Sequence, residues 1–157
     1  MKDKVIIITG AAMGLGYAAA QELASKGANL VLVDYNEKGL ENAKSGIAKE
    51  FPDVKTLNVV ADVSNEEAVK NYVDATVKTF GRIDGFYNNA GIEGRQASIT
   101  EYDVNVFKKV IDINLMGVYY GLRYVIPVMQ KQKFGRIVNV ASVGGIRGVL
   151  NQTPYVA

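Results

Sequence analysis

The sequence predicts an α/β fold with a doubly wound parallel sheet, covered by helices on both faces. Apolar, β-branched runs without polar alternation recur along the chain, which is typical of strands buried on both faces. A segment with helical periodicity follows each run, so crossovers rather than hairpins join consecutive strands. We expect strands over residues 4–9, 28–34, 54–60, 83–88 and 135–141. We expect helices over residues 14–26, 37–50, 65–80, 101–114 and 115–131.

The helix expected over 65–80 shows its periodicity most clearly. Apolar positions recur at three- and four-residue steps between Val69 and Phe80, which gives the helix one buried face. Ser64 and Glu67 have the spacing of a capping box at its start.

The helix expected over 115–131 has a different character. It is apolar almost all round, so it is either deeply buried or faces another subunit. The strand expected over 135–141 follows it and completes the sheet.

The connections between the strands constrain their order. Crossovers are right-handed, and if strands two and three extend to one side of the first and strands four and five to the other, the order is 3-2-1-4-5, which we expect. The winding direction reverses between strands one and four. Ligands bind beyond the carboxyl ends of the strands at such a point.

A glycine-rich turn follows the first strand. Gly10, Gly14 and Gly16 lie where the apolar run 5–8 gives way to the first helical segment. Glycine lets the backbone approach a diphosphate there, and the helix N-terminus supplies N–H donors and a positive potential. Asp34 ends the second strand, where a carboxylate can hold the 2′-hydroxyl of an adenosine ribose. The two features together predict a dinucleotide site, although the spacing G-x-x-x-G-x-G differs from the G-x-G-x-x-G fingerprint.

Asp34 also indicates which dinucleotide binds. A carboxylate at this position would repel a 2′-phosphate, and neither the glycine turn nor Tyr35-Asn36 offers an arginine or lysine to receive one. The sequence therefore favours NAD(H) over NADP(H).

Composition excludes several kinds of chemistry. The chain has no cysteine and no histidine, which excludes disulfides, a thiolate metal site and a Ser-His-Asp triad, so we expect no metal. The net charge is +2, and the densest basic cluster, Lys131, Lys133 and Arg136, is too small for a nucleic-acid footprint. No apolar stretch reaches membrane-spanning length or forms a signal-peptide core. We therefore expect a cytoplasmic protein that binds neither nucleic acid nor membranes.

Five ordered motifs resemble those of the short-chain dehydrogenase/reductase family in its single-domain form. They are the turn 9–16, the segment 88–91, Asn114, Ser142 and Tyr155, and the resemblance covers the whole chain. It implies a single, Rossmann-like dinucleotide-binding domain over residues 1–157, without the last two strands of the family.

The resemblance also implies a cofactor site. The glycine turn would line the diphosphate and ribose, the carboxylate after the second strand would take the adenosine ribose, and the residues after the third strand would contact adenine. Residues after the fourth strand would line the region between adenosine and nicotinamide. The implied cofactor-binding residues are Gly10, Gly14, Leu15, Gly16, Asp34, Asp62, Val63, Asn89, Ala90 and Gly91.

The activity implied by the resemblance is the interconversion of a secondary alcohol and a ketone by hydride transfer with NAD(H). Tyr155 would exchange a proton with the substrate oxygen as general acid/base, Ser142 would hold that oxygen, and Asn114 would order a water in the relay. Related enzymes are usually dimers or tetramers built on the helices around 101–131. The resemblance therefore implies a homo-oligomer that acts on a small molecule.

The chain departs from the family after Tyr155. A lysine that the family places four residues after the tyrosine would fall at position 159, beyond Ala157. We therefore expect the N-terminal portion of such an enzyme, and the alternative is a catalytically incompetent nucleotide-binding fragment without the lysine. A methyltransferase-type nucleotide fold is a third possibility, which the pairing of Ser142 with Tyr155 disfavours.

Overall fold

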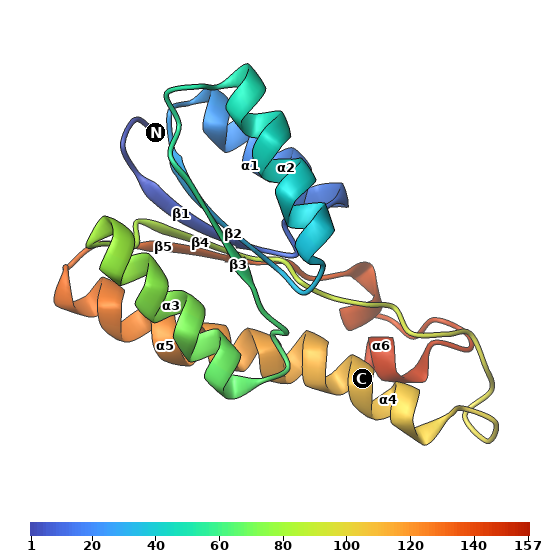
Figure 1. Cartoon of the computed structure of the whole chain (residues 1–157). Helices are drawn as coiled ribbons and strands as arrows, with labels where there is room; N and C mark the ends of the chain where they lie inside the picture. Colours follow the sequence, from blue (N-terminus) through green and yellow to red (C-terminus); the bar gives the residue numbers. More distant parts are fainter.

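A five-stranded parallel sheet forms the centre of the computed structural model, which describes residues 1–157 (Figure 1). The strand order is β3-β2-β1-β4-β5, so the predicted order is confirmed. The direction of winding reverses between β1 and β4, as the sequence analysis expects. The strands are β1 (Val5–Thr9), β2 (Asn29–Asp34), β3 (Thr56–Val60), β4 (Gly85–Asn88) and β5 (Arg136–Asn139).

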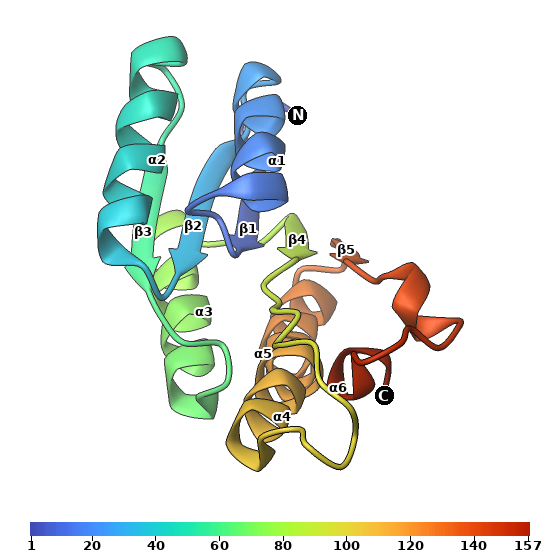
Figure 2. The same cartoon turned by 90° about the vertical axis from the view of Figure 1, so that its right-hand side faces the viewer.

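Helices cover both faces of the sheet. Figures 1 and 2 show α1 and α2 on one face and α3 and α5 on the other, while α4 and α6 lie beyond the carboxyl ends of the strands. The helices are α1 (Gly14–Ser25), α2 (Glu37–Glu50), α3 (Glu66–Phe80), α4 (Val104–Ile111), α5 (Gly117–Lys131) and α6 (Thr153–Val156). A π-helical segment, η1 (Asp112–Met116), joins α4 to α5, and a short 3₁₀ turn, η2 (Val143–Gly145), follows β5. None of the helices combines the length and the apolar composition needed to span a bilayer.

The core consists of two apolar layers, one on each face of the sheet. Successive residues of a strand point to opposite faces, so Ile6 and Leu30 pack toward α1 and α2, whereas Ile7 and Val31 pack toward α3 and α5. Burial on both faces explains why β1 and most of β2 read as unbroken apolar runs.

The start of α3 differs from the expectation. Its N-cap is Asn65, whose Oδ1 accepts a hydrogen bond from the backbone N–H of Ala68 at 3.0 Å. The predicted capping box of Ser64 and Glu67 is therefore wrong. Ser64 instead donates from Oγ to Asp62 at 2.7 Å, because an aspartate two residues upstream competes for its hydroxyl.

The predicted boundary between helices at residues 114 and 115 is also wrong. The backbone runs from α4 through η1 into α5 without a loop. A π-helical turn holds one residue more than an α-helical turn, so the side chains of α5 are rotated relative to those of α4 while the rod stays continuous.

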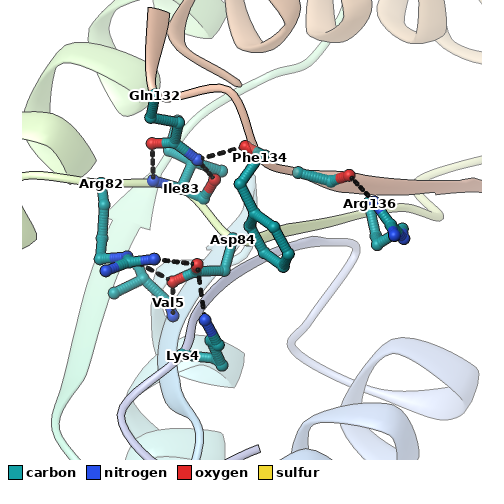
Figure 3. A network of polar contacts seen from close by, with 9 residues as sticks. Lys4, Val5, Arg82, Ile83, Asp84, Gln132, Phe134 and Arg136 are labelled. Atoms are coloured by element: carbon teal, nitrogen blue, oxygen red, sulfur yellow. Dashed lines mark hydrogen bonds and ion pairs between the residues drawn. The ribbon is translucent and has the colours of Figure 1, made fainter. Parts of the chain in front are cut away.

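At the end of the sheet opposite the carboxyl ends of the strands, polar groups form a hydrogen-bonded network around Asp84 (Figure 3). The Asp84 carboxylate is 2% exposed and accepts hydrogen bonds from Arg82 Nε at 2.7 Å and from the backbone N–H of Val5 at 3.0 Å. Lys4 lies 3.4 Å from the same carboxylate, and its ammonium is 4.6 Å from the centre of the Phe134 ring. The network ties the starts of β1, β4 and β5 together.

Candidate functional site

A cavity of about 780 Å³ opens beyond the carboxyl ends of the strands. Its volume lies in the range of small-molecule and cofactor sites. It is lined by most of the residues that the sequence singled out, from both the implied cofactor site and the implied catalytic group. These are Gly10, Leu15, Asp34, Asp62, Val63, Asn89, Ala90, Gly91, Asn114, Ser142 and Tyr155. Gly14 and Gly16 do not line it.

The glycine turn between β1 and α1 needs glycine for two different reasons. Gly10 and Gly14 have φ angles of +67° and +58°, a left-handed conformation that is costly for residues with a Cβ. Gly16 has no such φ, but a Cβ there would collide with the carbonyl oxygen of Gly10. The turn is therefore closed tightly on itself, and the N-terminus of α1 is directed at the cavity side of the sheet.

Asp34 holds two loops together from the end of β2. Its Oδ2 accepts a hydrogen bond from the backbone N–H of Ala12, and its Oδ1 accepts one from Asn36, both at 3.0 Å. The residue is 8% exposed, and it lines the cavity. A carboxylate oxygen can accept more than one hydrogen bond, so both oxygens retain capacity for hydroxyl groups of a ligand.

Asp62 and Val63 follow β3, and both line the cavity. The Asp62 Oδ1 accepts hydrogen bonds from the backbone N–H and the hydroxyl of Ser64, at 2.9 and 2.7 Å. The other oxygen of this carboxylate has no protein partner among these bonds. Val63 is buried against Gly117, where a Cβ would lie 2.9 Å from the valine Cγ2.

Thr9 is a residue of the site that the sequence analysis did not predict. It is fully buried, and its Oγ1 accepts hydrogen bonds from the backbone N–H groups of Asn89 and Ala90, at 2.9 and 3.0 Å. The Asn89 Nδ2 donates in return to the carbonyl of Thr9 at 2.9 Å. This exchange fixes the loop after β4 against the glycine turn. The available signal was a threonine at the end of an otherwise aliphatic strand.

Asn114 lies in the π-helical segment and is paired with the backbone of Ile92. Its Oδ1 accepts from the Ile92 N–H at 2.9 Å, and its Nδ2 donates to the Ile92 carbonyl at 2.8 Å. The side chain therefore positions the loop after β4 within the cavity. Its role in ordering a water remains a prediction.

Ser142 and Tyr155 both lie next to Gly144. The Ser142 Oγ accepts a hydrogen bond from the backbone N–H of Gly144 at 3.1 Å, which leaves its own proton free to donate. A Cβ on Gly144 would lie 3.3 Å from two ring carbons of Tyr155, so this glycine lets the ring pack against the turn. Both side chains are half-buried and line the cavity.

Comparison with known proteins agrees with this geometry. A family model described as "short chain dehydrogenase" matches residues 4–157. The chain belongs to the short-chain dehydrogenase family.

Individual members of the short-chain dehydrogenase family are closely similar to this chain. Levodione reductase of Leifsonia aquatica is 51% identical over 155 residues, which cover 99% of this chain and 58% of the relative. The crystal structure of a levodione reductase has a TM-score of 0.97 at 50% identity, covering 99% of this chain and 60% of that one.

Similar solved structures include complexes with NAD. NAD⁺-bound xylitol dehydrogenase has a TM-score of 0.94 at 38% identity, covering 99% of this chain and 59% of that one. Carveol dehydrogenase from Mycobacterium avium in complex with NAD has a TM-score of 0.91 at 30% identity, covering 99% and 60%. This short-chain dehydrogenase chain thus spans about three fifths of the length of these relatives.

Proposed function

We propose that this chain is the dinucleotide-binding part of an NAD(H)-dependent oxidoreductase that interconverts a secondary alcohol and a ketone. One observation carries the proposal. A single cavity is lined by Asp34, which ends β2, and by Ser142 and Tyr155, which follow β5 at the opposite side of the sheet from β2. A hydride-transferring site needs this combination, because the nucleotide must be anchored while the substrate oxygen meets a hydrogen-bond donor and a proton donor.

The residues present fit a dinucleotide. The left-handed glycines remove side chains from the turn, and the carboxylate of Asp34 is held by two backbone N–H groups at the edge of the cavity. Relatives of the same fold were crystallised with NAD, which supports this choice of cofactor. A bound nicotinamide would supply the hydride.

Two side chains would act on the substrate, and a third would position a loop of the site. Ser142 would donate its free proton to the substrate oxygen and stabilise the negative charge that grows there. Tyr155 would move a proton to or from that oxygen. Asn114 would keep the loop after β4 in place through its two bonds to Ile92.

The cofactor assignment is tested by titrating the chain with NADH and NADPH and following the fluorescence of the reduced nicotinamide. We expect NADH to bind at least about tenfold more tightly, since Asp34 would repel a 2′-phosphate. Asp34→Ala should weaken NADH binding by about tenfold or more and narrow the gap to NADPH. Asp53→Ala, which removes an exposed carboxylate outside the cavity, is the matched control. Equal affinity for the two dinucleotides in folded wild-type protein would contradict the assignment.

We propose further that two copies of the chain associate through α5. Tyr119 and Ile126 of α5 are exposed by 49% and 37%, and their seven-residue spacing places them on one helical face. Leu115 of η1, which is 60% exposed, precedes them. An apolar face of this kind is typical of an interface. Ile126→Lys should shift the protein toward a monomer in sedimentation velocity, whereas a monomeric wild type would contradict the proposal.

A further inference from the structure

The four methionines of the chain differ in their exposure and in what they line. Met13 is 73% exposed and Met1 is 53% exposed, whereas Met116 is half-buried and Met129 is 7% exposed. Met13 is the only one of the four that lines the cavity. Oxidants reach exposed sulfur most readily, so Met13 combines the greatest susceptibility to oxidation with a place in the candidate site.

The backbone on both sides of Met13 is fixed. The N–H of Ala12 donates to Oδ2 of Asp34 at 3.0 Å, and the carbonyl of Met13 accepts a hydrogen bond from the N–H of Tyr17 at 3.2 Å. The first bond ties the turn to the end of β2, and the second begins the hydrogen-bond ladder of α1. A chemical change in the Met13 side chain therefore acts at a fixed place in the cavity wall.

Met13 is also the N-cap of α1, and its side chain makes no capping hydrogen bond. The residues preferred at an N-cap are Ser, Thr, Asp and Asn, whose oxygens accept from the N–H groups of the first turn. A thioether is only a weak acceptor, so in α1 those N–H groups stay available to an anion such as a diphosphate. A methionine at this position thus favours binding of the cofactor.

Oxidation of the sulfur would reverse this advantage. The sulfur lone pair attacks one oxygen of hydrogen peroxide, an S–O bond forms as the O–O bond breaks, and the second oxygen leaves as water. The sulfur loses the two electrons that the peroxide gains, and the thioether becomes a polar sulfoxide. The sulfoxide oxygen is a strong hydrogen-bond acceptor that can take up N–H groups at the start of α1. It also places the negative end of a dipole near the turn that would receive the diphosphate.

We propose that Met13 is an oxidation site, and that its conversion to the sulfoxide by peroxides weakens binding of the dinucleotide. The inference rests on the proposed function, because it takes the glycine turn and Asp34 as the cofactor site. A bound cofactor would cover the cavity wall, so binding and oxidation should oppose each other. Methionine sulfoxide reductases remove the oxygen as water at the expense of a dithiol, which makes the modification reversible.

Peptide mass spectrometry of the full chain treated with hydrogen peroxide tests the site. We expect Met13 to be oxidised faster than Met116 and Met129, because it is the more exposed. Saturating NAD⁺ should slow the oxidation of Met13 by about fivefold or more. Met1 is exposed but lies outside the cavity, so its rate should not change and it serves as the internal control.

The consequence for binding is measured after the peroxide has been removed, by titration with NADH. The oxidised wild type should bind NADH about fivefold or more weakly than the untreated protein, and a methionine sulfoxide reductase with dithiothreitol should restore the affinity. Met13→Leu keeps an apolar side chain without sulfur, so its affinity should be the same before and after peroxide treatment. Met116→Leu removes a sulfur outside the cavity, so this variant should remain as sensitive to peroxide as the wild type.

The other outcomes separate this inference from the proposed function. Oxidation of Met13 that NAD⁺ does not slow, an unchanged affinity when Met13 is fully oxidised, or a loss of affinity that persists in Met13→Leu overturns the role of Met13. Each of these results, obtained with untreated protein that binds NADH, leaves the cofactor proposal standing. A folded, untreated chain that does not bind NADH contradicts the proposed function and this inference together.

Discussion

The hydroxyl of Thr9 joins the two loops on which the candidate site is built. It accepts hydrogen bonds from two backbone N–H groups of the loop after β4. The Thr9 side chain is fully buried. Both donors lie in a half-buried loop, and a donor that loses its acceptor there costs more than the net gain from an average hydrogen bond.

Thr9→Val keeps the shape of the side chain and removes the acceptor. We expect the free energy of unfolding to fall by about 2–3 kcal/mol, because the N–H groups of Asn89 and Ala90 are left without a partner. Urea denaturation followed by circular dichroism measures this change. Thr9→Ser, which retains the hydroxyl, is the control and should lose clearly less. Equal losses in the two variants would show that packing, not the hydrogen bonds, stabilises this position.

Tyr72 presents the opposite case, a buried hydroxyl that stabilises nothing. Its side chain lies fully inside the layer between the sheet and α3, and its Oη has no hydrogen-bond partner. Burial raises the pKa of this phenol, so the hydroxyl stays neutral across the ordinary pH range. Tyr72→Phe should therefore raise the free energy of unfolding by about 1 kcal/mol.

Urea titrations of the wild type and of Tyr72→Phe at neutral pH measure the difference. Tyr124→Phe is the comparison, since the Tyr124 hydroxyl is exposed and donates to Glu66 at 2.8 Å. That variant should show no gain. A loss of stability in Tyr72→Phe would reveal a partner for the hydroxyl inside the core.

At the scale of secondary-structure elements, the periodicity of the sequence predicted the strands and their order. Strands buried on both faces leave a strong apolar signal, and right-handed crossovers together with one reversal of direction after the third strand give the order 3-2-1-4-5. The cluster around the cavity follows from the same order, because residues at the carboxyl ends of neighbouring parallel strands must meet. Asp34 and Ser142 could therefore be placed at one edge from the sequence.

The π-helical segment could not be predicted in this way. A single extra residue in one turn leaves the apolar spacing of α4 and α5 intact on either side, so the pattern is equally compatible with two separate helices. The pairing of Asn114 with Ile92 was hidden for a related reason. Its partner is a backbone group 22 residues away, and backbone groups carry no sequence signal.

The close approach of α5 to the sheet depends on glycine. A Cβ on Gly121 would lie 2.7 Å from Cζ of Phe86 and 3.3 Å from Nδ2 of Asn88. The Phe86 ring is buried and cannot move aside, so Gly121→Ala should displace α5 and lower the free energy of unfolding by about 1–2 kcal/mol. Alanine has a higher helix propensity than glycine, so the clash must outweigh this gain for the loss to be seen.

Gly148→Ala is the matched control, because a Cβ there meets nothing within 4 Å. Thermal unfolding of both variants, followed by circular dichroism, should show a lower midpoint for Gly121→Ala alone. An unchanged midpoint would mean that the helix and the ring adjust to each other at little cost.

Across the whole molecule, the two ends of the sheet have opposite roles. At the carboxyl ends, the acidic groups of Asp34, Asp62 and Glu93 line an open cavity. At the other end, the Asp84 carboxylate is satisfied by Arg82, Lys4 and the backbone of Val5, so nothing is left to bind a ligand (Figure 3). The fully paired polar groups at this end hold the strands in register. The candidate functional residues lie at the opposite end, where the cavity is open.

The closed end predicts how stability depends on pH. Burial alone would raise the pKa of Asp84, but hydrogen bonds from Arg82, the Val5 N–H and Lys4 hold that pKa below its ordinary value of 3.8. A carboxyl whose pKa is lower in the folded state contributes stability that is fully present above the ordinary value and is lost as the pH falls through the folded value. The wild type should therefore lose stability steadily on acidification below about pH 5.

Asp84→Asn removes the charge and should cost about 2–3 kcal/mol of unfolding free energy at pH 7, because Arg82 and Lys4 lose their anion. Below pH 4 the difference from the wild type should shrink, since the wild-type carboxyl is then being protonated as well. Urea unfolding at pH 7, 5, 4 and 3 measures both effects. Asp74→Asn neutralises an exposed carboxylate on α3 and should stay within about 0.5 kcal/mol of the wild type. A difference between Asp84→Asn and the wild type that is constant from pH 7 to pH 3 would mean that shape, and not charge, is what Asp84 contributes to this end of the sheet.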